Sequence, residues 1–165
     1  MSNEQFPRAS FLLRIGAILY DLLVIIAVIM FAAGAALALS VLLDTLGVWP
    51  LTEGADHATR INGVVYQLYL LVVIFGFYAL FWHRGGQTLG MKAWRLRVQN
   101  TDGTRISWKQ ALIRSVTAML GFGNIAVLFG AEKLALQDRL AKCEVVRLTP
   151  EANQFKNWKK QNAPK

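Results

Sequence analysis

The stretch FLLRIGAILYDLLVIIAVIM, Phe11 to Met30, decides the fold because it is apolar enough to begin a membrane-spanning helix. Two charged residues interrupt it: Arg14 lies near its start and Asp21 near its middle. An aspartate that faces lipid at the centre of a helix costs about 2.5–3.5 kcal/mol on insertion scales. The sequence therefore predicts that Asp21 faces protein groups, water or a bound cation rather than lipid.

The apolar residues of the chain gather into long runs, and 55% of its 165 residues are hydrophobic. Between residues 15 and 43 only Tyr20, Asp21 and Ser40 are polar, and a second run extends over 64–82. About 20 apolar residues suffice to cross a bilayer, so both runs are predicted to be transmembrane helices. The polar N-terminus does not have the layout of a signal peptide, so we expect the first span to be retained.

The positions of the basic residues predict how the spans are oriented. The net charge is +8, but the loop between the two spans contains Arg60 alone of the 18 lysines and arginines. The segment 84–109, which follows the second span, contains six of them. The positive-inside rule then places the loop outside and both termini in the cytoplasm.

The segment 92–108, KAWRLRVQNTDGTRISW, changes to an alternation of apolar and polar residues around Asp102-Gly103. This pattern predicts a small cytoplasmic β-hairpin. A nucleic-acid-binding strand is disfavoured by the adjacent spans. The end of the chain is expected to form a short strand near residue 145 and then, over 149–165, a basic cytoplasmic tail near anionic headgroups.

The third apolar region, 111–130, has two interpretations. It is long enough to cross the membrane once, but that crossing would place eight later basic residues outside. If the chain instead turns back at Gly121-Phe122-Gly123-Asn124, residues 109–136 form a re-entrant helical hairpin. We favour the hairpin, and the single crossing is the alternative.

Asp21 is the main candidate for chemistry. Arg14 lies two helical turns before it on the same face, about 10 Å away along the axis, so a direct ion pair is not expected. Arg14 is expected either to snorkel to the interface or to tune Asp21. The alternative role for Asp21 is structural, as a carboxylate satisfied by Arg114 or a tyrosine. Gln67 adds a polar group to the second span.

Other motifs are absent from the sequence. GGQTLGMK lacks the Gly-Lys-Ser/Thr of a phosphate loop, and no serine lies in a G-x-S-x-G elbow. His57 and His83 do not have metal-ligand spacing, and Cys143 is the single cysteine. We therefore expect no cofactor, no metal site, no nucleic-acid partner and no enzymatic activity.

Several features together resemble the RDD family of bacterial membrane proteins. They are Arg14 and Asp21, the segment GQTLGMKAWRLRVQNTDGTRISWKQALIRS, and LQDRLAKCEVV near the end, and the resemblance covers residues 8–148. It implies that Arg14, Asp21 and Asp138 are the arginine and two aspartates that give the family its name, and that the chain belongs in a bacterial inner membrane. Gln137 departs from the histidine that commonly precedes the second aspartate. The resemblance also implies a suspected transport role, with some relatives linked to cation/proton exchange.

The expected fold is an all-α membrane protein with two transmembrane helices, a short helical hairpin and a small β-hairpin. The membrane domain would extend over 11–148, between a cytoplasmic segment at 1–10 and the tail. The favoured function is a small homo-oligomeric transporter, packed through the small residues Gly34 and Ala38 and moving a proton or monovalent cation. The alternative is a membrane scaffold, assembly factor or lipid-interacting module in which the same residues are structural. The predicted coupling residues are Asp21, Arg14, Asp138, Arg114 and Gln67.

Overall fold

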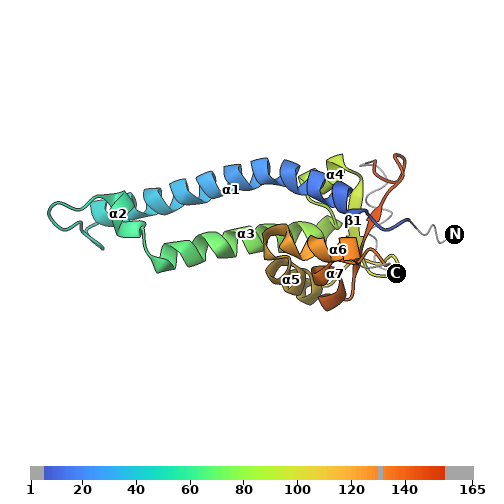
Figure 1. Cartoon of the computed structure of the whole chain (residues 1–165). Coiled ribbons are helices and arrows are strands. Elements are labelled where there is room, and N and C mark those ends of the chain that lie inside the picture. The colour runs from blue at the N-terminus through green and yellow to red at the C-terminus, as the bar shows by residue number, and fades with distance from the viewer. Residues whose placement is uncertain (1–5, 130–131, 155–165) are drawn as a thin grey trace. The chain divides into compact units, whose positions relative to one another are not determined.

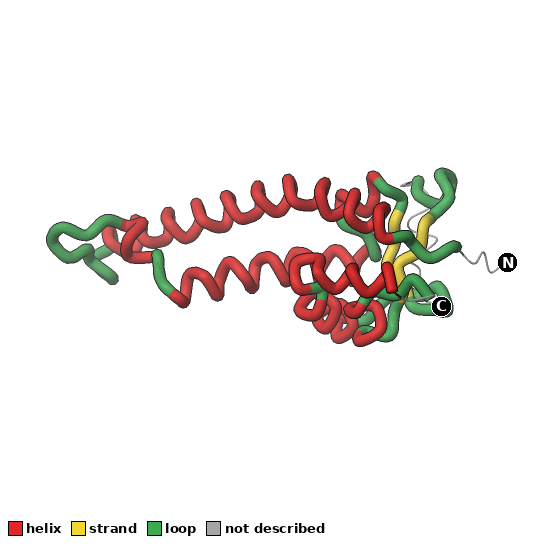
Figure 2. The backbone as a smooth tube through the Cα atoms, in the orientation of Figure 1, coloured by secondary structure: helices red, strands yellow, loops and turns green. Residues whose placement is uncertain are grey.

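The computed structural model describes residues 6–129 and 132–154, apart from the side chains of 119–121. In chain order the elements are α1 (Phe11–Thr45), α2 (His57–Ile61), α3 (Val64–Gly85), α4 (Leu89–Ala93), β1 (Leu96–Gln99), α5 (Trp108–Thr117), the 3₁₀ helix η1 (Met119–Ile125), α6 (Ala126–Phe129), α7 (Leu136–Leu140) and β2 (Glu144–Arg147) (Figure 1). Figure 2 shows that helices dominate and that the two strands lie side by side. The predicted fold class, with its long helices, shorter helices and small antiparallel sheet, is confirmed.

The helices α1 and α3 are long and apolar enough to cross a membrane. At 1.5 Å per residue the 35 residues of α1 extend over about 52 Å, more than the ~30 Å of a hydrocarbon core. The helix α3 ends where Gly86, with a φ of +68°, donates its N–H to the carbonyl of Trp82. This left-handed conformation is accessible to glycine at little cost. The predicted spans at 15–43 and 64–82 are therefore helical; α1 extends beyond both predicted ends, and α3 begins at the predicted residue and extends beyond the C-terminal end.

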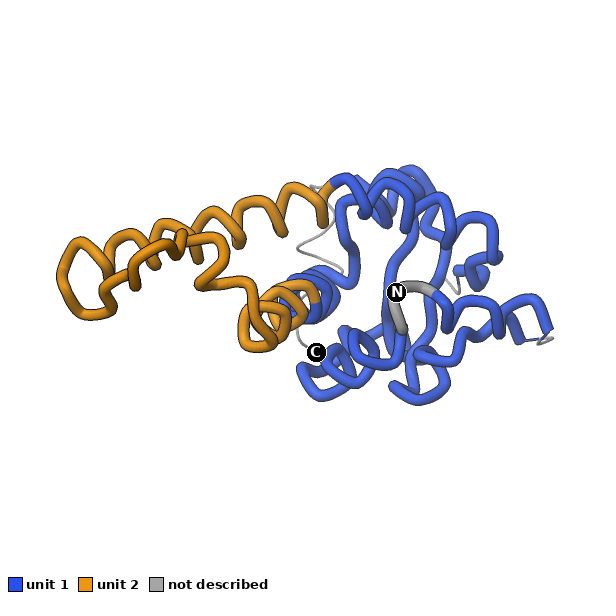
Figure 3. Tube along the Cα trace, turned by 60° about the vertical axis from the view of Figure 1, so that its left-hand side comes forward, with its two compact units in different colours: residues 1–23, 75–165 blue, residues 24–74 orange. Residues whose placement is uncertain are grey.

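The chain divides into two compact units, drawn in different colours in Figure 3. Val24–Ile74 form one unit, which contains the C-terminal part of α1, the helix α2 and the start of α3. The Ser40 hydroxyl is 3.1 Å from Nδ1 of His57, and the Tyr69 hydroxyl donates to the carbonyl of Ala32. Residues 1–23 and 75–165 make up the other unit.

The core of the unit made up of residues 1–23 and 75–165 contains the two-stranded sheet. The strands β1 and β2 are antiparallel, with Leu96 opposite Arg147 and Val98 opposite Val145. The N-terminal segment adds to the outer edge of β2, because Ala9 donates to the carbonyl of Val145 over 2.8 Å. The buried aliphatic side chains of the strands are Leu96 and Val98, at alternate positions of β1, and the adjacent Val145 and Val146 of β2. Leu96, Val98 and Val145 pack with residues of the surrounding helices.

The sheet corrects the prediction of a β-hairpin within 92–108. The predicted tight turn is present, because Asn100 donates to the carbonyl of Thr104. However, β1 pairs with β2, almost fifty residues further along the chain, and not with the residues that follow the turn. The other edge of β1 is occupied as well, since the Val98 N–H donates to the carbonyl of Gly86 over 2.7 Å. No edge is therefore left for a second strand at 104–108.

The third apolar region is bent. The segments Trp108–Thr117 and Phe122–Phe129 meet at 87°, which excludes one straight helix across 111–130. The break lies between Thr117 and Phe122, close to the stretch Gly121-Phe122-Gly123-Asn124 at which a turn was predicted. Residues 130–131 of the predicted hairpin, residues 1–5 of the N-terminal segment and residues 155–165 of the predicted tail lie outside the described residues.

Candidate functional site

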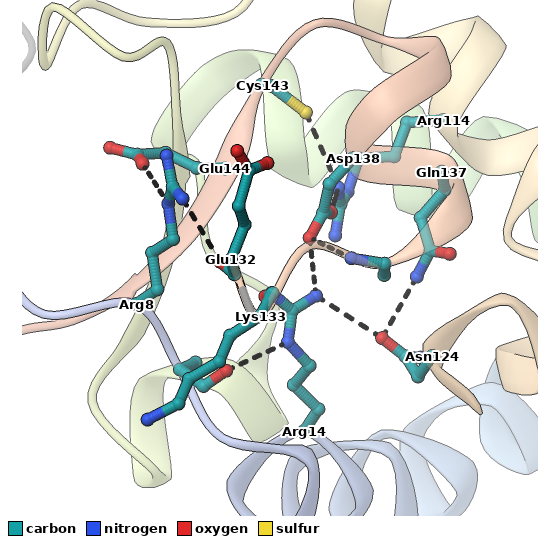
Figure 4. A network of polar contacts seen from close by, with 12 residues as sticks. Arg8, Arg14, Arg114, Asn124, Glu132, Lys133, Gln137, Asp138, Cys143 and Glu144 are labelled. Atoms are coloured by element: carbon teal, nitrogen blue, oxygen red, sulfur yellow. Dashed lines mark hydrogen bonds and ion pairs between the residues drawn. The ribbon is translucent and has the colours of Figure 1, made fainter. Parts of the chain in front are cut away.

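Two buried arginines and one buried aspartate form an ion cluster in the unit that contains the sheet (Figure 4). Nη1 of Arg14 lies 2.7 Å from Oδ2 of Asp138. Nη1 of Arg114 contacts the other carboxylate oxygen, Oδ1. The exposed fractions are 0% for Asp138, 4% for Arg14 and 3% for Arg114. We call these three residues the ion cluster.

Two short helices position Asp138 and Arg114 in the ion cluster. Asp138 is the third residue of α7, and its Oδ2 also accepts the N–H of Ala135, the residue that caps this helix, over 3.0 Å. Arg114 lies in the last turn of α5, with its guanidinium 4.7 Å from the ring centroid of Trp82. The ion cluster thus ties the start of α1 to α5, α7 and the end of α3.

The remaining donors of Arg14 are also used. Nε donates to the carbonyl of Ala9, Nη1 to Oδ1 of Asn124, and Nη2 to the carbonyl of Lys133, each over 3.3 Å. Of the two alternatives for Arg14, snorkelling to the interface was therefore wrong, and Arg14 pairs with Asp138. Its guanidinium lies inside the protein because a carboxylate and three neutral acceptors replace water around it.

The electrostatics of Asp138 follow from its neighbours. Burial alone would raise the pKa of Asp138, but the charges of Arg114 and Arg14 outweigh it and hold this pKa below its usual value. Burial raises the pKa of Cys143, which remains a thiol and accepts a hydrogen bond from Arg114 over 3.5 Å. Asp138 is therefore ionised at neutral pH, and the ion cluster carries one net positive charge.

Asn124 and Gln137 extend the ion cluster on one side. Nε2 of Gln137 donates to Oδ1 of Asn124 over 3.0 Å, the oxygen that also accepts from Arg14. Gln137 is buried, and its Oε1 makes no hydrogen bond among the described residues. This pair joins η1 to α7 and contributes no titratable group.

Asp21 lies in a separate set of contacts within the same unit. Its Oδ2 accepts the hydroxyl of Thr88 over 2.5 Å, and its Oδ1 accepts the backbone N–H of Gly90 over 2.8 Å. Asp21 is 3% exposed, and no cationic side chain among the described residues contacts it. The suggestion that Arg114 neutralises Asp21 was wrong, because Arg114 pairs with Asp138.

The segment GGQTLGMK builds this second site. Thr88 caps α4 by accepting the N–H of Met91, while its hydroxyl hydrogen is directed to Asp21. A Cβ at Gly90 would overlap the carbonyl oxygen of Ala17 and lie 2.8 Å from Cγ of Asp21. A glycine at position 90 therefore lets the backbone of α4 approach α1 closely enough to donate to the carboxylate.

The sequence model of the RDD family matches residues 8–142, most of the chain. The chain belongs to the RDD family. No curated protein and no solved structure matches the sequence. Together with the two long apolar helices, membership makes this RDD protein an integral membrane protein.

The structure divides the residues predicted for this RDD protein between different places. It brings Arg14, Arg114 and Asp138 together and leaves Asp21 with two neutral donors. Gln67 belongs to the unit Val24–Ile74, where its side chain is exposed and joins neither set of contacts.

Three further residues, Thr88, Gly90 and Asn124, contact the predicted ones and were not predicted as site residues. In the sequence, GGQTLGMK is notable only because it lacks a phosphate-loop pattern. The stretch Gly121-Phe122-Gly123-Asn124 predicts only a break in the helix. Thr88 and Gly90 become neighbours of Asp21 only through the packing of α4 against α1, which no local sequence pattern predicts.

Proposed function

We propose that this RDD protein is a small membrane transporter in which Asp21 binds and releases a proton or a monovalent cation. One observation carries the proposal. Asp21 is buried in a helix long enough to cross the membrane, and only the neutral donors Thr88 and Gly90 contact it among the described residues. A carboxylate without a cationic partner in an apolar setting requires a proton or a cation to balance its charge.

The surroundings of Asp21 suit a change of protonation. When ionised, the carboxylate accepts from both the Thr88 hydroxyl and the Gly90 N–H. A hydroxyl has lone pairs as well as a hydrogen, so Thr88 can rotate and accept from Asp21 once Asp21 carries a proton. Asp138 lacks this freedom because two guanidinium groups hold it ionised.

The proposal includes a homo-oligomer, since two spans and a bent segment enclose little volume alone. Gly34 and Ala38 are exposed on α1, and a Cβ at Gly34 would meet nothing within 4 Å. Small residues at this spacing allow two helices to approach closely. We expect Gly34→Leu to reduce the cross-linked species of the protein in membranes. An unchanged cross-linking pattern would exclude this face as the contact.

The proposed setting is a bacterial inner membrane with both termini in the cytoplasm, as the distribution of basic residues favours. The basic segment 84–109 and the predicted basic tail at 149–165 would then lie near anionic lipid headgroups. The proposed partners are these lipids, further copies of the chain and the transported ion. We propose neither an enzymatic reaction nor a nucleic-acid partner.

The test is cation-dependent proton flux in proteoliposomes that contain the purified protein. We expect the wild type to support flux and Asp21→Asn to abolish it, because an amide cannot take up a proton at neutral pH. Glu53→Gln is the matched control: it makes the same change at an exposed carboxylate in the loop after α1 and should retain flux. Equal assembly of the three proteins must first be shown by size-exclusion chromatography.

A second candidate function is a non-transporting membrane scaffold. It is favoured by the ion cluster, whose buried charges pair with one another and need no ligand. Absence of flux with any common monovalent cation, together with loss of assembly in Asp21→Asn, would support the scaffold and contradict transport. Flux that persists in a well-assembled Asp21→Asn protein would also contradict the proposed role of Asp21.

A further inference from the structure

The helix α4 and its capping residue Thr88 provide both donors to Asp21. They are held by Asn153, which lies far from α4 in the sequence. Oδ1 of Asn153 accepts from Nε2 of Gln87 over 3.0 Å, and its Nδ2 donates to the carbonyl of Lys92 over 2.9 Å. The backbone carbonyl of Asn153 also accepts from Nζ of Lys92. Gln87 directly precedes the capping residue Thr88, and Lys92 lies in the last turn of α4. One residue therefore contacts both ends of the helix.

External contacts of this kind matter because α4 has only five residues. So short a helix is not stable by itself, and its position depends on what surrounds it. Gln87 is buried and makes a second bond, from Nε2 to the carbonyl of Leu96 over 2.6 Å, so its amide joins Asn153 to the strand β1. Without the side chain of Asn153, Gln87 would keep its hydrogen bond to Leu96 in β1. The hydrogen bonds from Gln87 to Asn153 and from Asn153 to the carbonyl of Lys92 would be lost.

We infer that Asn153 is a positioning residue for Asp21, acting through α4 and without touching the carboxylate. It keeps the Thr88 hydroxyl and the Gly90 N–H within hydrogen-bond distance of Asp21. The consequence for transport rests on the proposed function. The positioning itself can be measured without any transport assay.

Hydrogen exchange tests the positioning directly. In Asn153→Ala we expect faster amide exchange in the peptide that contains Gly90, with β1 and β2 as protected as in the wild type. Gln154→Ala is the matched control, since it removes an exposed neighbouring amide for which the described residues show a backbone hydrogen bond only, and it should exchange like the wild type. Unchanged protection of α4 in Asn153→Ala would overturn the inference, as would equal loosening of α4 and the sheet.

A double variant separates positioning from an unrelated effect on stability. Gln87→Ala removes the partner of Oδ1 of Asn153, so the exchange change in Gln87→Ala/Asn153→Ala should be smaller than the sum of the two single changes. A strictly additive result would mean that the two side chains act on α4 independently, which contradicts the inference that Asn153 positions α4 through Gln87.

The transport readout is the pH dependence of flux in the same proteoliposomes. In Asn153→Ala the profile should shift to higher pH, because the ionised carboxylate of Asp21 is less well supplied with donors. A profile that superimposes on that of Gln154→Ala would contradict the role of Asn153. If the wild type shows no flux, the proposed function is wrong, and hydrogen exchange alone decides whether Asn153 positions α4.

Discussion

At Asp138, two guanidinium groups and one backbone N–H meet two carboxylate oxygens, and all three side chains are buried. Breaking a buried ion pair by removing one partner usually costs about 3–5 kcal/mol, since the remaining charge is left without compensation. In this ion cluster both arginines depend on the same aspartate. The neutralisation of Asp138 therefore affects two buried charges at once.

Asp138→Asn should lower the free energy of unfolding by about 3–5 kcal/mol. Tryptophan fluorescence during thermal unfolding in detergent would measure the change. Glu132→Gln is the control, because it neutralises an exposed carboxylate near the ion cluster while leaving the Glu132 carbonyl free to accept from Arg8. A variant at position 138 as stable as the control would show that the arginines do not need this aspartate.

The pH dependence of stability has a definite sign at Asp138. Its pKa in the folded protein lies below the usual value of 3.8, so between those two values the unfolded chain binds more protons. The stabilisation is fully present above pH 3.8 and is lost as the pH falls through the lowered pKa. We expect unfolding curves of the wild type to show this loss on acidification and those of Asp138→Asn to lack it.

The sequence revealed Arg14 and Asp21 because a charge inside an apolar run is conspicuous and expensive. It did not reveal their partners. Asp138 lies far along the chain from Arg14, and no local pattern connects them. The donors of Asp21 were also hidden, because Thr88 and Gly90 act through a close approach of α4 to α1.

At the scale of elements, the approach of α4 to α1 depends on one missing side chain. A Cβ at Gly90 would overlap backbone at Ala17, which cannot rotate away, so α4 would have to move from Asp21. The pairing of the strands was also not predictable from the local sequence. The alternation over 92–99 and the turn after it were visible in the sequence, but the strand that pairs with β1 was decided by which edges are already occupied.

Gly90→Ala should destabilise the protein by about 1–3 kcal/mol through overpacking. It should also accelerate amide exchange in α4. Gly76→Ala is the matched control, since it makes the same change in the helix α3 at a position with nothing within 4 Å, where alanine should be neutral or slightly stabilising. Equal behaviour of the two variants would mean that α4 does not pack closely on α1.

At the scale of the whole molecule, the charge distribution predicts a topology. The native Cys143 is buried, so it should not compete for a membrane-impermeant thiol reagent. In intact cells Glu53→Cys should react and Lys109→Cys should react only after lysis, because both positions are exposed and the first lies in the loop after α1. Labelling of Lys109→Cys in intact cells would reverse the proposed orientation.

The pairing of Arg14 with Asp138 also has a consequence for how the protein is made. During translation α1 leaves the ribosome long before α7 is synthesised, so the guanidinium of Arg14 has no counter-charge until Asp138 has been made. The N-terminal segment likewise lacks its backbone hydrogen bonds to β2 until β2 has been synthesised. A chain that stops after Thr117 keeps both long helices but neither partner, and pulse–chase labelling should show its degradation to be faster than that of the full chain. The synthesis of α7 and β2 would thus determine whether the N-terminal part of the chain is protected from the cell's proteases.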